Sequence, residues 1–317
     1  MSLRYVLGRV GTAVPTLLVI SAILFLLVQL APGGPEQVLL DQQGSPAELA
    51  RLRTQLGLDR SWPVQYVEWL GRAVRGDLGR SFQSGMPVTA LMAERLLPTL
   101  QLTGTALVLA LAVGVGAGVL AAVRPHTLLD RLTTAIALLG ISFPAFWLGI
   151  MLILLFSGTL GWLPSSGIAG AGEEESLRSR LLHGILPSLT LAAYQIAIFM
   201  RFTRSSMLDV VHQEYITTAR AKGLSEASTL LRHALRNALL PVLTILGFSV
   251  RLLVSGSVLV ETVFAWPGLG RLAVDAVFQR DYPVILGVAM LVAGITVLMN
   301  ITVDLLYAVV DPRITLG

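Results

Sequence analysis

Six long apolar runs constrain the fold of this chain more than any other feature. They lie at about 10–31, 99–123, 132–156, 182–200, 239–260 and 284–310. A helix needs roughly 20 apolar residues to cross about 30 Å of hydrocarbon, and it satisfies its own backbone hydrogen bonds in lipid. The fourth run is short, and the fifth is interrupted by Arg251. The pattern predicts an all-α integral membrane protein with six transmembrane helices.

The composition agrees with this class. Hydrophobic residues make up 54% of the 317 residues and charged residues 13%, whereas a soluble domain has about 25% charged residues. The first run follows Arg4 and Arg9, is too long for a signal-peptide core and lacks a convincing cleavage site, so we interpret it as an uncleaved span. The absence of cysteine excludes a disulfide framework and thiolate chemistry. For the same reason, the sequence does not indicate whether the protein works in an oxidising or a reducing compartment.

The distribution of basic residues predicts the orientation. With the amino terminus inside, the cytoplasmic segments hold eleven Arg and Lys residues and the two short outer loops hold four. The long first outer loop counts little in this rule. Both termini are therefore predicted to be cytoplasmic. The domains are then the amino terminus with the first span (1–31), an extracytoplasmic loop (32–98) and a core (99–317) that contains a cytoplasmic loop at 201–241.

The outer loop contains two predicted amphipathic helices. They are PAELARLRTQLG and PVQYVEWLGRAVRG, with Pro46 and Pro63 at first-turn positions, where a missing N–H is tolerated. The second helix is expected to place Val64, Val67 and Trp69 near one side. Its aromatic residues, interpreted as packing or interfacial anchors or as a docking surface, are Trp62, Tyr66 and Trp69. In the third span, GISFPAFWLGI contains a proline, Pro144, that predicts a kink near the middle.

The polar interval 201–241 separates two spans and carries six basic residues: Arg201, Arg204, Arg220, Lys222, Arg232 and Arg236. Its few helix-breaking residues predict one helix from about 207 to 222, ended by Gly223 in a left-handed conformation, with Leu224 closing the apolar contact of the cap. Ser225 is the predicted N-cap of a second helix that begins at Glu226. Such a bent element presents a rigid surface to a partner. A DNA-binding helix-turn-helix fits the same pattern, but membrane spans on both sides argue against nucleic acid.

This interval also carries a family resemblance. The run TARAKGLS, followed by HALRNALLPVLT, resembles the cytoplasmic loop of permease subunits of ABC importers in the dipeptide/oligopeptide/nickel group. LGLDRSWPVQYVEWLGRAVRGDLGRSF, ETVFAWPGLGRLAVDAVFQRDYP and DLLYAVVDPRI resemble the same group, in order along nearly the whole chain. One departure is the triplet Thr-Thr-Ala, where the general importer motif has Glu-Ala-Ala before the glycine.

The resemblance implies a type I ABC importer-like permease fold with a cytoplasmic coupling helix that docks on an ATP-hydrolysing subunit. Carried over, the coupling residues are Thr217, Thr218, Ala219, Arg220, Ala221, Lys222, Gly223 and Leu224. The implied partners are a second permease subunit, expected to be a related chain, two ATP-binding subunits and an extracytoplasmic substrate-binding protein. The implied location is the bacterial plasma membrane, in contact with lipid. Di- or oligopeptides are the expected substrates, while nickel chelates, haem-like cargo or another small solute stay open.

The chain lacks the residues for chemistry of its own. A phosphate-binding loop needs Gly-Lys followed by Ser or Thr, but Lys222, the only lysine, follows Ala221. ATP and Mg²⁺ are therefore expected to be used by partner subunits, with no cofactor bound here. The four histidines, His126, His183, His212 and His233, lie in loops or at span ends, and His212 and Glu214 fall on different helical faces. We predict neither catalytic nor metal-binding residues.

A few polar residues inside the spans are candidates for the substrate pathway. A charge at the bilayer centre costs roughly 2.5–3.5 kcal/mol, so Arg251 is expected to face protein or a water-filled cavity. It is either a structural partner or a pathway residue that meets a peptide carboxylate. Tyr194, Gln195 and Asn300 are further candidates. A secondary transporter would need mid-membrane acids or inverted repeats, and neither is apparent. A purely structural or signalling membrane protein would not require the basic corner.

Overall fold

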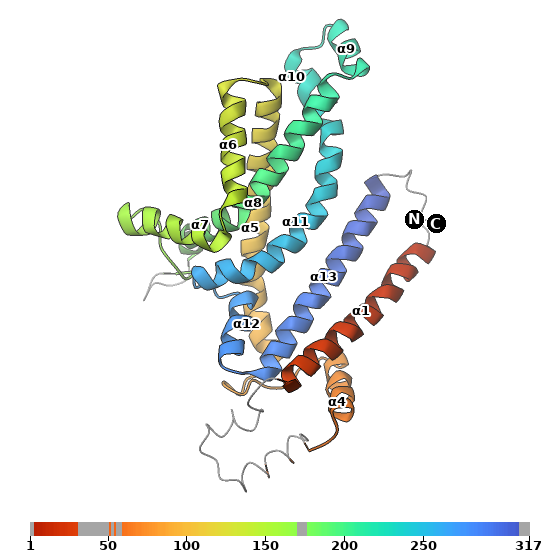
Figure 1. The fold of residues 1–317 in the computed structure, drawn as a ribbon, viewed down its shortest axis with the longest axis vertical. Coiled ribbons are helices and arrows are strands. Elements are labelled where there is room, and N and C mark those ends of the chain that lie inside the picture. Colours follow the sequence, from red (N-terminus) through yellow and green to blue (C-terminus); the bar gives the residue numbers. More distant parts are fainter. Residues whose placement is uncertain (1–2, 31–50, 52–53, 55–58, 170–175, 311–317) are drawn as a thin grey trace. The chain divides into compact units, whose positions relative to one another are not determined.

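The structure is a computed structural model that describes residues 3–30, 51, 54, 59–169 and 176–310, without the side chains at 3–10, 244, 251 and 303–310. Within this part, regular structure is helical apart from an isolated bridge between Arg80 and Pro87. The helices (Figure 1) are α1 Leu3–Leu30, α4 Trp62–Val74, α5 Val88–Val123, α6 Leu128–Ser142, α7 Ala145–Leu152, α8 Leu177–Val211, α9 Glu214–Ala221, α10 Glu226–Ser228, α11 Leu235–Val263, α12 Leu269–Phe278 and α13 Tyr282–Val310. Two π-helical segments, Ile153–Thr159 and Thr229–Ala234, continue α7 and join α10 to α11.

Five described helices are long and apolar enough to cross a membrane: α1, α5, α8, α11 and α13. They contain five of the six predicted spans. All five are longer than predicted, and α5 and α8 are extended most, because α5 begins at Val88 and α8 extends to Val211. The predicted helix within 46–57 falls almost wholly outside the described residues.

The third predicted span is the exception. The expected kink within one helix is wrong, because α6 ends at Ser142 and α7 begins at Ala145, with a bend of 109° between the two segments. Pro144 has no N–H to donate, and it forces the preceding Phe143 into an extended conformation at ψ 133°. The Phe143 ring stacks on Trp147 at 4.5 Å across the break. Counted together as one span, the bent pair is the sixth crossing.

The described chain divides into two compact units. The first contains residues 1–98 and 267–302. In it Trp69 and Tyr66 of α4 pack on Phe25 of α1, with ring centroids 6.0 and 5.6 Å from that of Phe25. These two aromatic residues are packing anchors, as predicted. The expected grouping with Val64 and Val67 is wrong: both valines are exposed, Val67 to 65%.

A buried carboxylate closes the turn-rich segment of the first unit. Asp281, between α12 and α13, accepts a hydrogen bond from the Ser81 hydroxyl and another from the Phe82 N–H at 3.1 Å. The interaction joins positions about 200 residues apart in sequence. Sequence reasoning treated 261–283 as an outer loop, whereas the structure places the short amphipathic helix α12 in it.

The second unit, with described residues 99–169, 176–266 and 303–310, contains the core around α5, α8 and α11. Phe199, Phe264 and Trp266 are among its buried side chains. Two glycines of α5 allow a close helix approach: an added Cβ would lie 2.8 Å from the Ile196 carbonyl oxygen at Gly114 and 2.7 Å from that of Met200 at Gly118. Small residues four apart permit this kind of packing in membranes.

An ion pair joins α6 to α8 in the same unit. Arg204 donates from Nε to Oδ1 of Asp130 at 2.6 Å and from one terminal nitrogen to Oδ2 at 2.8 Å. The backbone N–H of His126 donates to the same carboxylate at 2.9 Å. Asp130 is buried, so its charge is matched by three donors rather than by water.

Candidate coupling corner and polar residues of the spans

The segment 201–241 folds into a corner between α8 and α11, but its first helix differs from the prediction. A single helix from 207 to 222 is wrong, since α8 ends at Val211 and α9 spans Glu214–Ala221. Gln213 between them is extended, at ψ 150°. The His212 ring closes the end of α8 through Nδ1 and the Leu208 carbonyl oxygen, 2.7 Å apart. Neither glycine nor proline marks this break.

Gly223 ends α9 as predicted. Its φ of +79° lies in the left-handed region that glycine adopts without a steric penalty. The Gly223 N–H donates to the Arg220 carbonyl at 2.9 Å and the Leu224 N–H to the Ala219 carbonyl at 3.4 Å. These two bonds form a complete Schellman motif. The expected apolar closure by Leu224 is at most partial, because that side chain is 41% exposed.

The next helix begins where the sequence predicts. The Ser225 hydroxyl accepts a hydrogen bond from the Ser228 N–H at 3.3 Å and so caps α10. Arg220 reaches across the corner and forms a bidentate pair with Glu226, at 3.1 and 2.7 Å. Hydrogen bonding by Arg220 lowers the pKa of the Glu226 carboxyl below its ordinary value, and the same bonds raise the pKa of Arg220. Both groups are exposed, so the pair orients the corner more than it stabilises the fold.

One face of α9 is anchored. Ile216 is fully buried in a cluster with Met207 of α8 and Ala234 of the π-helical segment. The Tyr215 hydroxyl accepts a hydrogen bond of 2.7 Å from the Asn237 side-chain amide of α11. Helix α9 is therefore fixed to both helices that it connects.

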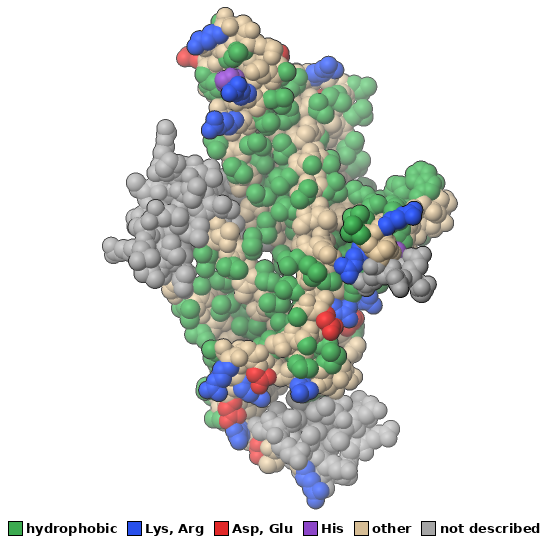
Figure 2. Space-filling model, turned by 180° about the vertical axis from the view of Figure 1, so that it is seen from behind, with side chains coloured by type: hydrophobic (Ala, Val, Ile, Leu, Met, Phe, Trp, Pro, Cys, Tyr) green, Lys and Arg blue, Asp and Glu red, His purple; other side chains and the backbone are tan. Residues whose placement is uncertain are grey.

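The opposite face of α9 and the turn after it are exposed. Seven of the eight predicted coupling residues lie there: Thr217, Thr218, Arg220, Ala221, Lys222, Gly223 and Leu224. Ala219 is the exception, since it is buried beside Ile216. Lys and Arg side chains gather at this end of the unit, and apolar side chains cover the helices beneath it (Figure 2). The corner presents a short, charged, conformationally fixed surface.

The predicted pathway residues belong to different units and differ in burial. Gln195 is buried and bonds to Ser249 of α11 through both amide atoms, from Nε2 to the Ser249 carbonyl at 3.3 Å and to Oε1 from the Ser249 hydroxyl at 3.0 Å. Its neighbour Tyr194 is 42% exposed. Asn300 is half-buried on α13 in the first unit. The side chain of Arg251 lies outside the described residues.

Two buried polar links were missed by sequence reasoning. Glu261 of α11 is fully buried and accepts a hydrogen bond of 2.9 Å from the Thr99 hydroxyl of α5. The other is the Asp130–Arg204 pair. An acid at the end of an apolar run was the available signal for Glu261, but its partner lies 162 positions away. Among the described residues, no group of three His, Cys, Asp or Glu side chains could hold a metal ion.

Comparison with known proteins agrees with this architecture. The sequence model for the inner membrane component of binding-protein-dependent transport systems matches residues 114–316, and the corresponding N-terminal model matches residues 2–103. The fold resembles that of a chain in an inward-facing structure of the MetNI methionine ABC transporter, at a TM-score of 0.57 and 20% identity, over 70% of this chain and 96% of that one.

Relatives that match over nearly their whole length identify the group within this transport family to which the chain belongs. A putative peptide permease protein of Brucella suis biovar 1 is 44% identical over 98% of this chain and 99% of its own length. The oligopeptide transport system permease protein AppB of Bacillus subtilis is 43% identical over 98% of both chains. The glutathione transport system permease protein GsiC of Escherichia coli K12 is 45% identical over 98% of this chain and 99% of its own length. The chain therefore belongs to the inner membrane component family of binding-protein-dependent transport systems, as a permease subunit of the dipeptide/oligopeptide/nickel group of ABC importers.

Proposed function

We propose that this permease subunit imports di- or oligopeptides and that the exposed face of α9, with the turn at Gly223, receives the force for transport from an ATPase subunit. The geometry of the corner is the observation that carries the proposal. One face of α9 is buried against α8 and the start of α11, so a push on the other face moves both helices instead of being absorbed by a loop. ATP hydrolysis resides in the separate subunits of this family.

The proposed assembly contains two permease subunits, of which the second is a related chain, two ATPase subunits and an extracytoplasmic substrate-binding protein. Both termini lie in the cytoplasm, on the same side as the corner. The excess of basic residues in the predicted cytoplasmic segments supports this orientation.

Site-directed cysteines test the corner and the orientation together, because the natural chain has no cysteine. Thr218→Cys lies on the exposed face of α9, and Ser84→Cys lies on an exposed turn of the predicted outer loop. We expect Thr218→Cys to cross-link to the ATPase subunit and to resist an impermeant maleimide in intact cells. Ser84→Cys should be labelled and should form no such cross-link. The reverse labelling pattern would reject the orientation. Cross-links absent at every exposed α9 position would reject the docking surface.

Peptides are the proposed cargo because the full-length relatives include proteins named as peptide, oligopeptide and glutathione permeases. Mass spectrometry of ligand retained by the purified complex with its binding protein tests this. Retention of a metal chelate without any peptide would contradict the proposal.

Arg251, Tyr194 and Asn300 remain proposed pathway residues. Gln195 also stays a proposed pathway residue, and its amide joins α8 to α11 through Ser249. Arg251→Ala should reduce uptake or alter preference among peptides of different charge. Unchanged uptake and unchanged preference would exclude Arg251 from the pathway.

A further inference from the structure

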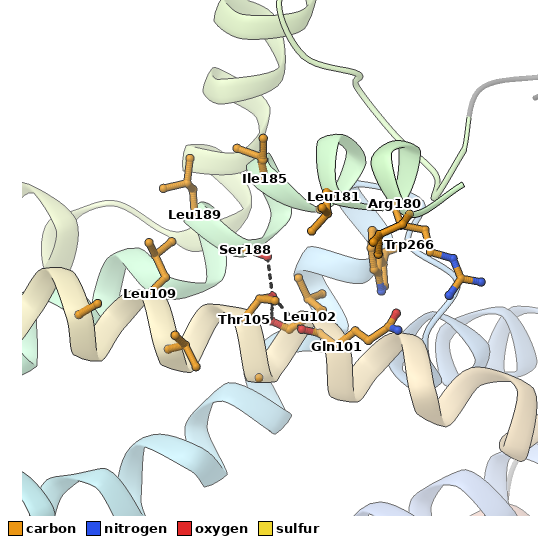
Figure 3. A pocket seen from close by; sticks show the side chains of 15 residues that line it. Gln101, Leu102, Thr105, Leu109, Arg180, Leu181, Ile185, Ser188, Leu189 and Trp266 are labelled. Carbon is orange, nitrogen blue, oxygen red and sulfur yellow. Dashed lines mark hydrogen bonds between the residues drawn. The ribbon is translucent and has the colours of Figure 1, made fainter. Parts of the chain in front are cut away.

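A pocket of about 750 Å³ lies between α5 and α8, within the second unit and away from the coupling corner. Side chains from Gln101 to Ala112 on α5 and from Leu177 to Leu189 on α8 line it, and Trp266 closes one end. In the close view, Gln101, Arg180 and Trp266 lie together at one end, while Leu109 and Leu189 lie at the other (Figure 3).

The two ends of this pocket differ in polarity. Arg180 and Gln101 supply a charge and an amide at one end. The polar groups of the floor already bond to one another: the Thr105 and Ser188 hydroxyls are 2.9 Å apart, and Thr105 also donates to the Gln101 carbonyl at 2.7 Å. The remaining lining is aliphatic apart from Trp266. The pocket therefore suits a ligand with a polar head and a long apolar tail.

The length of the pocket matches one leaflet of a bilayer. From Gln101 to Ala112 the helix rises about 16 Å, at 1.5 Å per residue. Half of the hydrocarbon thickness of a typical bilayer is about 15 Å. A chain that begins beside Arg180 and follows α5 would reach about the middle of the membrane.

We propose that this pocket binds an anionic phospholipid, with its phosphate at Arg180 and one acyl chain along α5 and α8. A guanidinium offers planar, paired donors that match phosphate oxygens. A peptide in transit is a poorer occupant because the hydroxyls of the floor already have hydrogen-bond partners. A helix of a second permease subunit is the competing occupant, and a cross-linking experiment distinguishes it.

Gly104 provides a test at the pocket wall. It lines the pocket, and an added Cβ there would meet nothing within 4 Å, so the side chain of Gly104→Leu starts from open space and extends into the pocket. Gly116 on the same helix is equally open and does not line the pocket, so Gly116→Leu is the matched control. Val108→Phe, from a side chain that is 67% exposed, fills the pocket from a second position.

The experiment is native mass spectrometry of the complete, delipidated transporter titrated with phosphatidylglycerol or with phosphatidylcholine of the same chains. Wild type and Gly116→Leu should bind phosphatidylglycerol alike. Gly104→Leu and Val108→Phe should each bind it about tenfold more weakly, since displacing about two methylene groups is worth that factor. Arg180→Gln should lose the preference for phosphatidylglycerol and keep chain binding.

Four results would overturn the proposal. The first is unchanged lipid binding by both pocket-filling variants. The second is an unaltered headgroup preference in Arg180→Gln. The third is a Gly104→Cys cross-link to the second permease subunit, which would show that this subunit covers the pocket. The fourth is a loss of peptide uptake in Gly104→Leu with unchanged lipid binding, which would assign the pocket to the transport pathway.

Discussion

Replacing Gly223 with valine should uncouple ATP hydrolysis from transport. The φ of Gly223 is +79°, and an added Cβ would meet nothing within 4 Å, so the cost is the backbone conformation alone. A non-glycine residue in the left-handed region costs roughly 1–2 kcal/mol, and a β-branched residue is among the least tolerant there. That energy lowers the population of the native corner about 5- to 30-fold relative to its alternatives.

A matched glycine separates coupling from general destabilisation. Gly76 follows α4 in the same Schellman motif, with a φ of +82° and an open Cβ position. Its N–H donates to the Ala73 carbonyl at 2.9 Å, and the next N–H, that of Asp77, donates to the Arg72 carbonyl at 3.0 Å. Gly76→Val therefore has the same local cost in the other unit. Gly223→Asn should recover function, because asparagine tolerates the left-handed region.

The assay is peptide uptake per ATP hydrolysed by the reconstituted importer, after assembly has been confirmed by size-exclusion chromatography. Gly223→Val should keep ATPase activity and lose most uptake. Gly76→Val and Gly223→Asn should stay near the wild-type ratio. A wild-type ratio of uptake to ATP hydrolysis in Gly223→Val would refute the reasoning. An equal loss of uptake in Gly76→Val would show that the effect comes from general destabilisation.

Three further predictions concern stability. Gly118→Ala should destabilise the complex by about 1–3 kcal/mol through overpacking and so lower its melting temperature. Gly116→Ala, whose Cβ position is open, should leave the melting temperature unchanged. Equal shifts in the two variants would contradict the close approach of α5 and α8. Asp130→Ala should lower the free energy of unfolding, measured with a chemical denaturant, by about 3 kcal/mol, because it leaves the partly buried Arg204 charge without its carboxylate. A decrease no larger than that caused by an alanine substitution at an exposed position would contradict this. The lowered pKa of Glu226 means that its contribution is present above the ordinary value of 4.5 and is lost as the pH falls through the lower folded value. Amide exchange at 223–226, corrected for intrinsic rates, should therefore rise below pH 4.5 in wild type and not in Glu226→Gln, and parallel profiles would contradict it.

Local chemistry was enough to predict several elements. The length of the apolar runs predicted the positions of the spans, because a helix in lipid must satisfy its own backbone hydrogen bonds. Gly223 and Ser225 marked the corner, because a left-handed cap and a side-chain cap each depend on a few residue types at one position. These features need no knowledge of distant partners.

The features that the sequence did not reveal depend on tertiary contacts. A proline can kink a helix or end it, and at Pro144 the new helix α7 is held against α8 and α11: a Cβ added at Gly149 would lie 3.0 Å from the Phe264 ring. The break at Gln213 has no local signal, since burial of Ile216 decides where α9 lies. The hydrogen bond between Glu261 and Thr99 could not be predicted from the sequence either, because only the fold brings Thr99 close to Glu261.

The contacts of the corner suggest how its motion reaches the membrane. Its two ends continue into α8 and α11, and those helices are joined again at Gln195 and Ser249. From Val211 to Gln195 the helix rises about 24 Å. Two helices bonded at both ends of that distance resist sliding past each other, so a displacement of α9 should tilt them together. Breaking the inner bond with Gln195→Leu should therefore weaken the transmission of force and leave the proposed docking of α9 intact.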